Sequence, residues 1–271
     1  MPRIQTREGV ELYVKDWGAG KPVVLLHGWP LSSDTFDDLG LALAGAGYRA
    51  IAYDRRGFGR SEQPWKGYEY DTLAADLADV IEATGARDAA LVGFSMGGGE
   101  VVRYLARFAN TVTHAVLIGA VPPFLLKTAD NPDGVDRSVF DGMKTGIAED
   151  RAKFWAGFFP QFYGSRLLSQ PVSDEVIEWS RAVAMQASLK ATLDCVDAFG
   201  TTDFRQDLAA IRVPTLVIHG TSDATVPIDI SGRAAAKAIA GATLREYEGG
   251  PHGLLASHKQ AIAKDLLDFL R

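Results

Sequence analysis

Up to residue 120, the hydrophobic pattern of the chain alternates between two kinds of segment. Short, mostly apolar runs end in turns, and longer segments carry apolar residues at helical spacing. Short continuous runs are typical of strands buried in a parallel sheet, and the longer segments are typical of amphipathic helices. The predicted strands are residues 10–17, 23–26, 48–53, 89–92 and 112–120, and the predicted helices are 35–46, 70–83 and 98–105.

This alternation stops at residue 121 and returns near residue 203. Between them we find no convincing strand, but aromatic residues become frequent and prolines at 132, 160 and 171 separate helical segments. Strands resume at 213–219 and 242–247, and helices at 228–240 and 257–270. We therefore expect an α/β fold with a mostly parallel central sheet flanked by helices. Residues 1–120 and 203–271 would form its core, and residues 121–202 a helical cap insertion.

Composition narrows the class of protein. At 271 residues with 47% apolar content, the chain fits one large α/β domain with an inserted part. A net charge of −6 without a basic cluster argues against nucleic acid or an anionic membrane as partner. Cys195 is the only cysteine, and we identify neither a signal peptide nor an apolar run of the ~18 residues that a spanning helix needs. We expect a cytoplasmic protein.

The stretch Gly93-Phe94-Ser95-Met96-Gly97 joins a predicted strand to a predicted helix. In that context the pattern G-x-S-x-G predicts a nucleophile elbow, in which a sharp turn exposes the serine hydroxyl. Gly93 and Gly97 omit the side chains that would collide in the turn. The helix N-terminus offers free N–H groups to a developing oxyanion. The competing interpretation is a Gly-rich turn with a bystander serine.

A serine nucleophile needs a base, and the chain has five histidines. His252 lies in a Gly/Pro loop directly after a predicted strand and is the best candidate. His27 and His219 also end strands, but they lie in His-Gly turns, where we expect structural hydrogen bonds.

Asp223, just past the strand at 213–219, is the candidate acid. An ordinary turn aspartate is the alternative. The order Ser95, Asp223, His252 matches the chain order of α/β-hydrolase triads, which favours the catalytic interpretation. For an oxyanion hole, the N–H of Met96 follows the nucleophile, and the loop after Leu26 offers the N–H of Trp29. Pro30 is excluded as a donor because proline has no N–H.

Sequence signatures of cofactor sites are missing. No G-x-G-x-x-G follows a strand, and there is no P-loop, H-E-x-x-H or pair of cysteine ligands. We therefore expect neither a cofactor nor a metal.

At this point the chain resembles the cofactor-free serine arylesterases and haloperoxidases (perhydrolases) of the α/β-hydrolase fold. The similarity extends over nearly the whole sequence. Its marks are Lys15-Asp16-Trp17-Gly18, His27-Gly28-Trp29, the segment 53–61, Gly93 to Gly99, the segments 187–192 and 202–205, Val213 to Gly220, and Pro251-His252-Gly253.

The resemblance implies a triad of Ser95, His252 and Asp223, with an oxyanion hole from the N–H groups of Trp29 and Met96. It implies hydrolysis of small, often aromatic esters such as phenyl acetate, with water or hydrogen peroxide as acyl acceptor. It also implies a homo-oligomer, a trimer or larger.

Pro30 refines this expectation. Family members that favour peroxide resemble this chain in having proline after the oxyanion tryptophan, where esterase-leaning members often have leucine. Proline restricts the residue before it to extended backbone, which would move the Trp29 carbonyl towards the acyl site. There it would accept a hydrogen bond from hydrogen peroxide. The alternative is that proline only shapes the loop.

The aromatic insertion also has two interpretations, because aromatics at helical spacing mostly form core. We expect Phe124, Phe158 and Phe162 to face Ser95 and line a small apolar acyl or alcohol pocket, with Val121 and Pro30 beside them. Such a pocket suits short acyl chains and aryl leaving groups, and disfavours charged substrates.

Other functions remain open. Haloalkane dehalogenases and epoxide hydrolases need aspartate at the elbow, so Ser95 excludes both. A lactamase, a carbon–carbon bond hydrolase or a hydroxynitrile lyase would use the same triad. A ligand sensor built on hydrolase machinery would give one acylation burst and little turnover.

Overall fold

The computed structural model describes residues 3–108, 112–165 and 169–271. Within them, eight strands form one sheet in the order β1-β2-β4-β3-β5-β6-β7-β8. β1 and β4 pair antiparallel with β2, and all other neighbours are parallel. The strands are β1 (Arg3–Gln5), β2 (Glu11–Gly18), β3 (Lys21–Leu26), β4 (Tyr48–Tyr53), β5 (Ala89–Phe94), β6 (Val112–Ile118), β7 (Thr215–Gly220) and β8 (Thr243–Tyr247).

The buried strands are the ones whose sequence is a continuous apolar run. Every residue of β5 and of β7 is buried, because helices cover both faces of the sheet there. In the edge strand β8 every residue is exposed or half-buried. The three-residue β1 was not predicted, since it is too short to show a periodic pattern.

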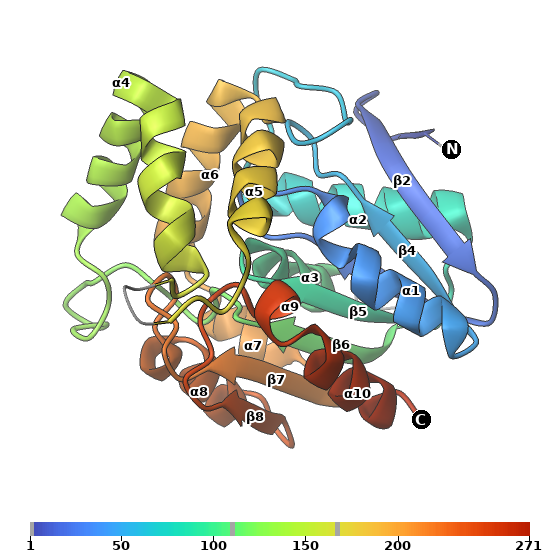
Figure 1. The fold of residues 1–271 in the computed structure, drawn as a ribbon. Coiled ribbons are helices and arrows are strands. Elements are labelled where there is room, and N and C mark those ends of the chain that lie inside the picture. The colour runs from blue at the N-terminus through green and yellow to red at the C-terminus, as the bar shows by residue number, and fades with distance from the viewer. Residues whose placement is uncertain (1–2, 109–111, 166–168) are drawn as a thin grey trace.

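Helices cover the sheet on both sides (Figure 1), which confirms the predicted α/β class. α1 and α10 pack together on one face, and α2, α3, α7 and α8 lie on the other. The helices of this core are α1 (Asp37–Gly45), α2 (Tyr70–Thr84), α3 (Met96–Arg107), α7 (Arg205–Ala210), α8 (Gly232–Ala238), α9 (Leu254–Ser257) and α10 (Lys259–Phe269), with 3₁₀ turns at Ser33–Phe36 and Ile228–Ile230.

Three further helices lie between β6 and β7 in the sequence: α4 (Arg137–Phe162), α5 (Asp174–Gln186) and α6 (Leu189–Thr201). α4 packs against both of the others, and the three stand together beside the sheet (Figure 1). We call them the cap helices. The described part of 121–202 adds no strand to the sheet; isolated bridges pair Leu126 with Val135 and Thr128 with Asn131. The boundaries at 121 and 202 stay a prediction.

The break within α4 corrects the expected role of one proline. Pro160 does not separate two helices, because it lies inside α4, in its last turn. The interruption is at Asp150, whose backbone is non-helical at φ −155° and ψ 89°. Its Oδ1 accepts the N–H of Lys153 at 2.9 Å, which is how an aspartate begins a new helix.

Candidate active site

Ser95 occupies the turn between β5 and α3, as the sequence predicted. Its backbone has φ 54° and ψ −118°, a left-handed region that costs a non-glycine residue about 1–3 kcal/mol. The surrounding contacts explain the two glycines of the motif. A Cβ on Gly93 would lie 2.5 Å from the Gly97 carbonyl oxygen, and a Cβ on Gly97 would lie 2.2 Å from that of Leu26. Backbone this close tolerates only glycine.

The structure brings Ser95, His252 and Asp223 together, and we call these three the Ser–His–Asp array. Ser95 Oγ lies 2.9 Å from His252 Nε2, and His252 Nδ1 lies 2.6 Å from Asp223 Oδ2. Since a carboxylate only accepts, Nδ1 carries the proton and Nε2 accepts from the serine hydroxyl. The three residues follow β5, β7 and β8, so the carboxyl edge of the sheet positions all of them.

Asp223 is buried among donors. Oδ1 accepts the N–H groups of Thr225 and Val226 at 2.9 and 2.7 Å, and His219 Nε2 lies 3.3 Å from Oδ2. Burial by itself raises the pKa of this carboxyl, but the charge of His252 and the hydrogen bonds from His219 and His252 outweigh it and hold the pKa well below its usual range. Asp223 therefore stays ionised and keeps the His252 proton on Nδ1.

The contact between His219 and Asp223 was missed by sequence reasoning, which expected only a structural hydrogen bond. That bond exists, because His219 Nε2 lies 2.9 Å from the Val226 carbonyl oxygen. The same N–H also points near the Asp223 carboxylate. The spacing of four residues between His219 and Asp223 is the signal in the sequence, since it spans the tight turn after β7.

Two aromatic rings hold the imidazole of His252. The ring centroids of Phe94 and Phe162 lie 5.2 and 4.9 Å from that of His252. This packing fixes the ring plane along the line between Ser95 and Asp223.

A buried hydrogen-bond network holds the loop after β3 in place. Arg55 Nη2 donates to the His27 carbonyl oxygen at 2.5 Å, and Arg55 Nε donates to Glu100 Oε1 at 2.6 Å. His27 Nε2 accepts the Arg55 N–H at 2.9 Å, and its Nδ1 lies 2.9 Å from the Gly28 carbonyl oxygen. Burial, and then the charge of Arg55, lowers the pKa of His27 to about 3. His27 is therefore neutral and structural, as expected from its His-Gly turn.

The side chain of Trp29 packs against the cap helices. Its indole Nε1 donates to the Thr192 carbonyl oxygen at 3.1 Å, and its ring centroid lies 5.2 Å from Trp155 and 5.6 Å from Phe158. Among the hydrogen bonds of the described residues, none uses the backbone N–H of Trp29 or of Met96. Both predicted oxyanion donors are thus free to bind a ligand.

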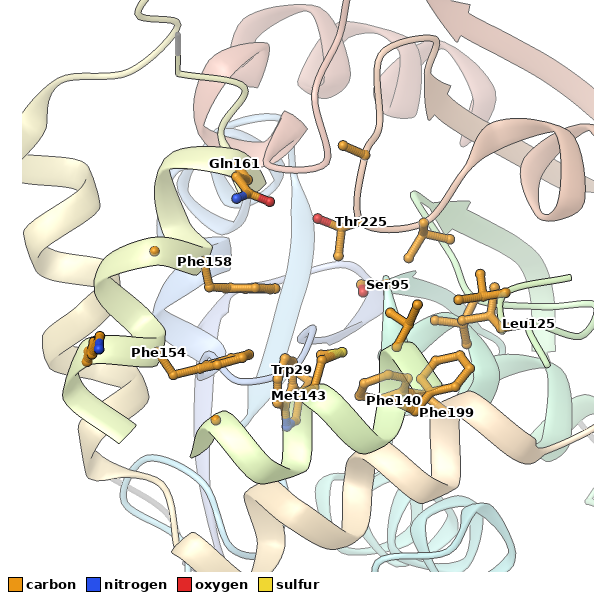
Figure 2. A pocket seen from close by; sticks show the side chains of 18 of the residues that line it. Trp29, Ser95, Leu125, Phe140, Met143, Phe154, Phe158, Gln161, Phe199 and Thr225 are labelled. Atoms are coloured by element: carbon orange, nitrogen blue, oxygen red, sulfur yellow. The ribbon is translucent and has the colours of Figure 1, made fainter. Parts of the chain in front are cut away.

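A cavity of about 630 Å³ lies between the Ser–His–Asp array and the cap helices (Figure 2), and we call it the main cavity. Ser95 and Trp29 line it, as do the predicted Val121 and Phe158. Phe140, Met143, Phe154 and Phe199 also line it and were not singled out from the sequence. Their helical spacing resembles that of ordinary core aromatics, so no sequence signal separates the two roles.

Three predicted pocket residues are placed elsewhere. Phe162 packs on His252 and lines a second cavity, and Phe124 is buried with the Arg205 guanidinium 5.2 Å from its ring centroid. Pro30 is buried, is joined to Trp29 by a cis peptide bond, and is not among the residues that line the main cavity. The pocket prediction is revised accordingly.

The described residues contain neither a cluster of metal ligands nor a helix that could span a membrane. In residues 3–108, 112–165 and 169–271, no three His, Cys, Asp or Glu side chains are grouped as metal ligands would be. Over the same described residues, every helix is too short or too polar to cross a bilayer.

Known proteins resemble the chain along its whole length. The profile of the alpha/beta hydrolase fold family matches residues 21–259. The chain is 44% identical over 273 residues to the non-heme chloroperoxidase CPO-A1 of Kitasatospora aureofaciens, covering 100% of this chain and 99% of that protein. It is 43% identical over 279 residues to the bifunctional esterase/perhydrolase DCH of Acinetobacter calcoaceticus, covering 100% of both.

Among solved structures, the bromoperoxidase from Bacillus anthracis superposes with a TM-score of 0.95, at 45% identity and with 99% of each chain covered. The profile match, the relatives and the superposed structure all indicate the same family. The chain belongs to the alpha/beta hydrolase fold family, within the group that contains the non-heme chloroperoxidases and perhydrolases.

Proposed function

We propose that the protein is a serine ester hydrolase that also transfers acyl groups to hydrogen peroxide, with Ser95, His252 and Asp223 as its triad. The observation that carries the proposal is the hydrogen-bonded Ser–His–Asp array, whose serine opens into the main cavity beside two free N–H groups. Relatives named chloroperoxidase and esterase/perhydrolase, at 43–47% identity, support the same activities.

The geometry supports the following steps. His252 Nε2 takes the Ser95 proton while Oγ attacks the ester carbonyl carbon. The carbonyl oxygen becomes an oxyanion and accepts the N–H groups of Met96 and Trp29. The tetrahedral intermediate then expels the alkoxide, which takes the proton from His252, and an acyl-Ser95 ester remains.

In the second half, His252 takes a proton from water or hydrogen peroxide, and the resulting nucleophile attacks the acyl carbon. Ser95 leaves and regains its proton from His252. Water gives the carboxylic acid, and peroxide gives the peracid. The released peracid carries the oxidising oxygen, so it would oxidise bromide or chloride outside the site, without a metal or cofactor in the steps above.

The lining of the main cavity supports neutral substrates with aryl or aliphatic groups. Around Ser95 the labelled side chains of its wall include Phe158, Trp29 and Thr225 (Figure 2), and none of the three is charged. A lactamase or a carbon–carbon bond hydrolase would use the same triad, so measured turnover of an ester substrate is needed to distinguish the esterase from these alternatives.

The test uses phenyl acetate hydrolysis, and bromination of a dye in acetate buffer with hydrogen peroxide and bromide. Ser95→Ala should lower kcat for the ester about 10⁴-fold or more and abolish bromination. Ser138→Ala, an exposed serine in α4, should change neither. Pro30→Leu should lower the peroxide-to-water preference of the acyl-enzyme while ester hydrolysis continues.

Each other outcome has a definite meaning. Ester turnover without bromination would keep the esterase and reject peracid formation. One acylation burst without turnover would replace the proposal with a ligand sensor. Turnover that survives Ser95→Ala would reject the triad.

A further inference from the structure

The break at Asp150 divides α4 into two arms, and both arms line the main cavity. The first arm contributes Val139, Met143 and Gly146, and the second contributes Phe154, Gly157 and Gln161. In each arm the lining residues are three or four positions apart, so they form one helical face. Figure 2 shows Phe154, Phe158 and Gln161 along one arm, with Met143 and Phe140 facing them from the other.

Two positions in these faces are glycines, with different surroundings. A Cβ on Gly146 would lie 3.0 Å from the Phe154 ring, so a larger residue there would push against the other arm. A Cβ on Gly157 would meet no heavy atom within 4 Å. Gly157 is exposed and lines the main cavity in the middle of the face formed by Phe154 and Gln161, so a side chain at 157 would occupy open space at the mouth of that cavity.

Local structure gives no reason for glycine at 157. The residue is within α4 and is not at a positive φ. Glycine inside a helix costs about 1 kcal/mol relative to alanine. Neither packing nor backbone conformation requires glycine at 157, so the open space beside it is the remaining reason for a glycine there.

Volume and charge indicate what the space admits. The main cavity, at about 630 Å³, falls within the range of sites for drug-sized ligands, about 300–1,000 Å³. Phenyl acetate would fill only a small part of it. The charged residues that line the cavity are Glu149, Asp150 and Lys153, all exposed at the break in α4, so the mouth is acidic on balance and the interior is apolar.

We propose that Gly157 determines substrate size, and that the preferred ester carries a neutral apolar group much larger than phenyl or acetyl, held between the two arms of α4. This inference rests on the proposed function in one respect only, namely that the ester carbonyl lies at Ser95. It differs from the expectation of a small pocket for short acyl groups.

The experiment compares Gly157→Phe and Gly157→Ala with the control Gly142→Phe. Gly142 lies in the same helix, and a Cβ there would also have no heavy atom within 4 Å, but Gly142 does not line the main cavity. Substrates are p-nitrophenyl acetate, hexanoate and decanoate, and the acetates of methanol, phenol and 2-naphthol. The two series separate a large acyl group from a large alcohol group.

In the wild type, kcat/KM should rise with size in at least one series. Gly157→Phe should lower kcat/KM for the largest member of that series at least tenfold, mainly through KM, and leave the smallest within about twofold. Gly157→Ala should fall between, and Gly142→Phe should match the wild type. A wild type that prefers the smallest ester in both series, or an equal effect of Gly157→Phe on all sizes, would overturn the inference.

A binding measurement separates this inference from the proposed function. In a Ser95→Ala background, acetophenone and 1-phenyl-1-decanone are titrated while tryptophan fluorescence is followed, since Trp29 lines the main cavity. Gly157→Phe should weaken binding of the larger ketone at least tenfold and that of acetophenone little. If esters are not hydrolysed but this pattern appears, the proposed function fails and the size inference stands. If the larger ketone binds equally well with and without Gly157→Phe in the Ser95→Ala background, the size inference is rejected even if the wild type is an active esterase.

Discussion

The two sides of the active site are built in different ways. On the core side, directional bonds and buried charge fix each group: Asp223 accepts from backbone and from two histidines, and Arg55 ties the loop after β3 to Glu100. On the cap side, aromatic rings and an interrupted helix shape a cavity. Among the described residues, every buried Asp, Glu, Lys, Arg and His lies outside residues 121–202.

This contrast indicates where amino-acid substitutions are tolerated. Proton transfer requires atoms held within a few tenths of an ångström, and hydrogen bonds between buried groups provide this. Size selection requires only a shape, which apolar side chains provide and can vary. Glycines show the same contrast, since Gly97 has a carbonyl oxygen 2.2 Å from its absent Cβ, while Gly157 has nothing within 4 Å.

On the core side, a substitution that keeps the shape of the site but removes one charge should lower activity most. In Asp223→Asn, the side-chain oxygen would keep the N–H groups of Thr225 and Val226, so the amide NH₂ would face His252 Nδ1. The imidazole proton must then move to Nε2, which can no longer take the Ser95 proton. We expect kcat to fall about 10⁴-fold, measured with phenyl acetate at unchanged melting temperature.

The control for this change is on the cap side. Asp141→Asn alters an exposed aspartate of α4 and should leave kcat within about twofold of the wild type. A loss below tenfold in Asp223→Asn would contradict the role of the carboxylate.

Substituting one glycine on each side of the active site should change the free energy of unfolding in opposite directions. Gly97→Ala forces backbone apart at the elbow and should lower the free energy of unfolding by about 1–3 kcal/mol, since the contacting atoms of Leu26 and His27 are backbone. Gly157→Ala should instead raise it, by up to about 1 kcal/mol. Urea unfolding of both variants measures the difference. Equal effects would show that the cap glycine is as constrained as the core one.

A change in the pH dependence of stability, with no loss of catalytic groups, tests the buried network around His27. His27 is neutral when folded, with a pKa of about 3, but protonates near its ordinary value of 6.5 when unfolded. Between these values the unfolded chain binds about one more proton, so the free energy of unfolding falls as pH falls. In His27→Gln, the slope of that free energy against pH from 4 to 6 should decrease by about 1.4 kcal/mol per pH unit.

Urea midpoints across this pH range provide the measurement. His258→Gln is the comparison, because burial lowers the pKa of His258 too but that residue is only partly buried. Its slope should change less than that of His27→Gln. An unaltered slope in His27→Gln would mean that the network admits a proton when folded.

Local rules in the sequence determined much of the fold and the chemistry. Continuous apolar runs identified the buried strands, and the glycines around Ser95 identified the elbow, because both depend on neighbours within a few residues. The placement of Ser95, Asp223 and His252 at one edge of the sheet then followed from their positions just after strands, since parallel strands bring their carboxyl ends to one edge.

Which side chains line the cap side of the active site was decided by the tertiary structure alone. Phe158 and Phe162 are four residues apart in α4 and Phe124 lies in the loop after β6, yet of the three only Phe158 lines the main cavity, because the packing of distant segments turns the other two rings to His252 and to Arg205. The break at Asp150 and the open space at Gly157 likewise depend on how α4 meets its neighbours. A cavity is what packing leaves unfilled, so no local pattern encodes its size.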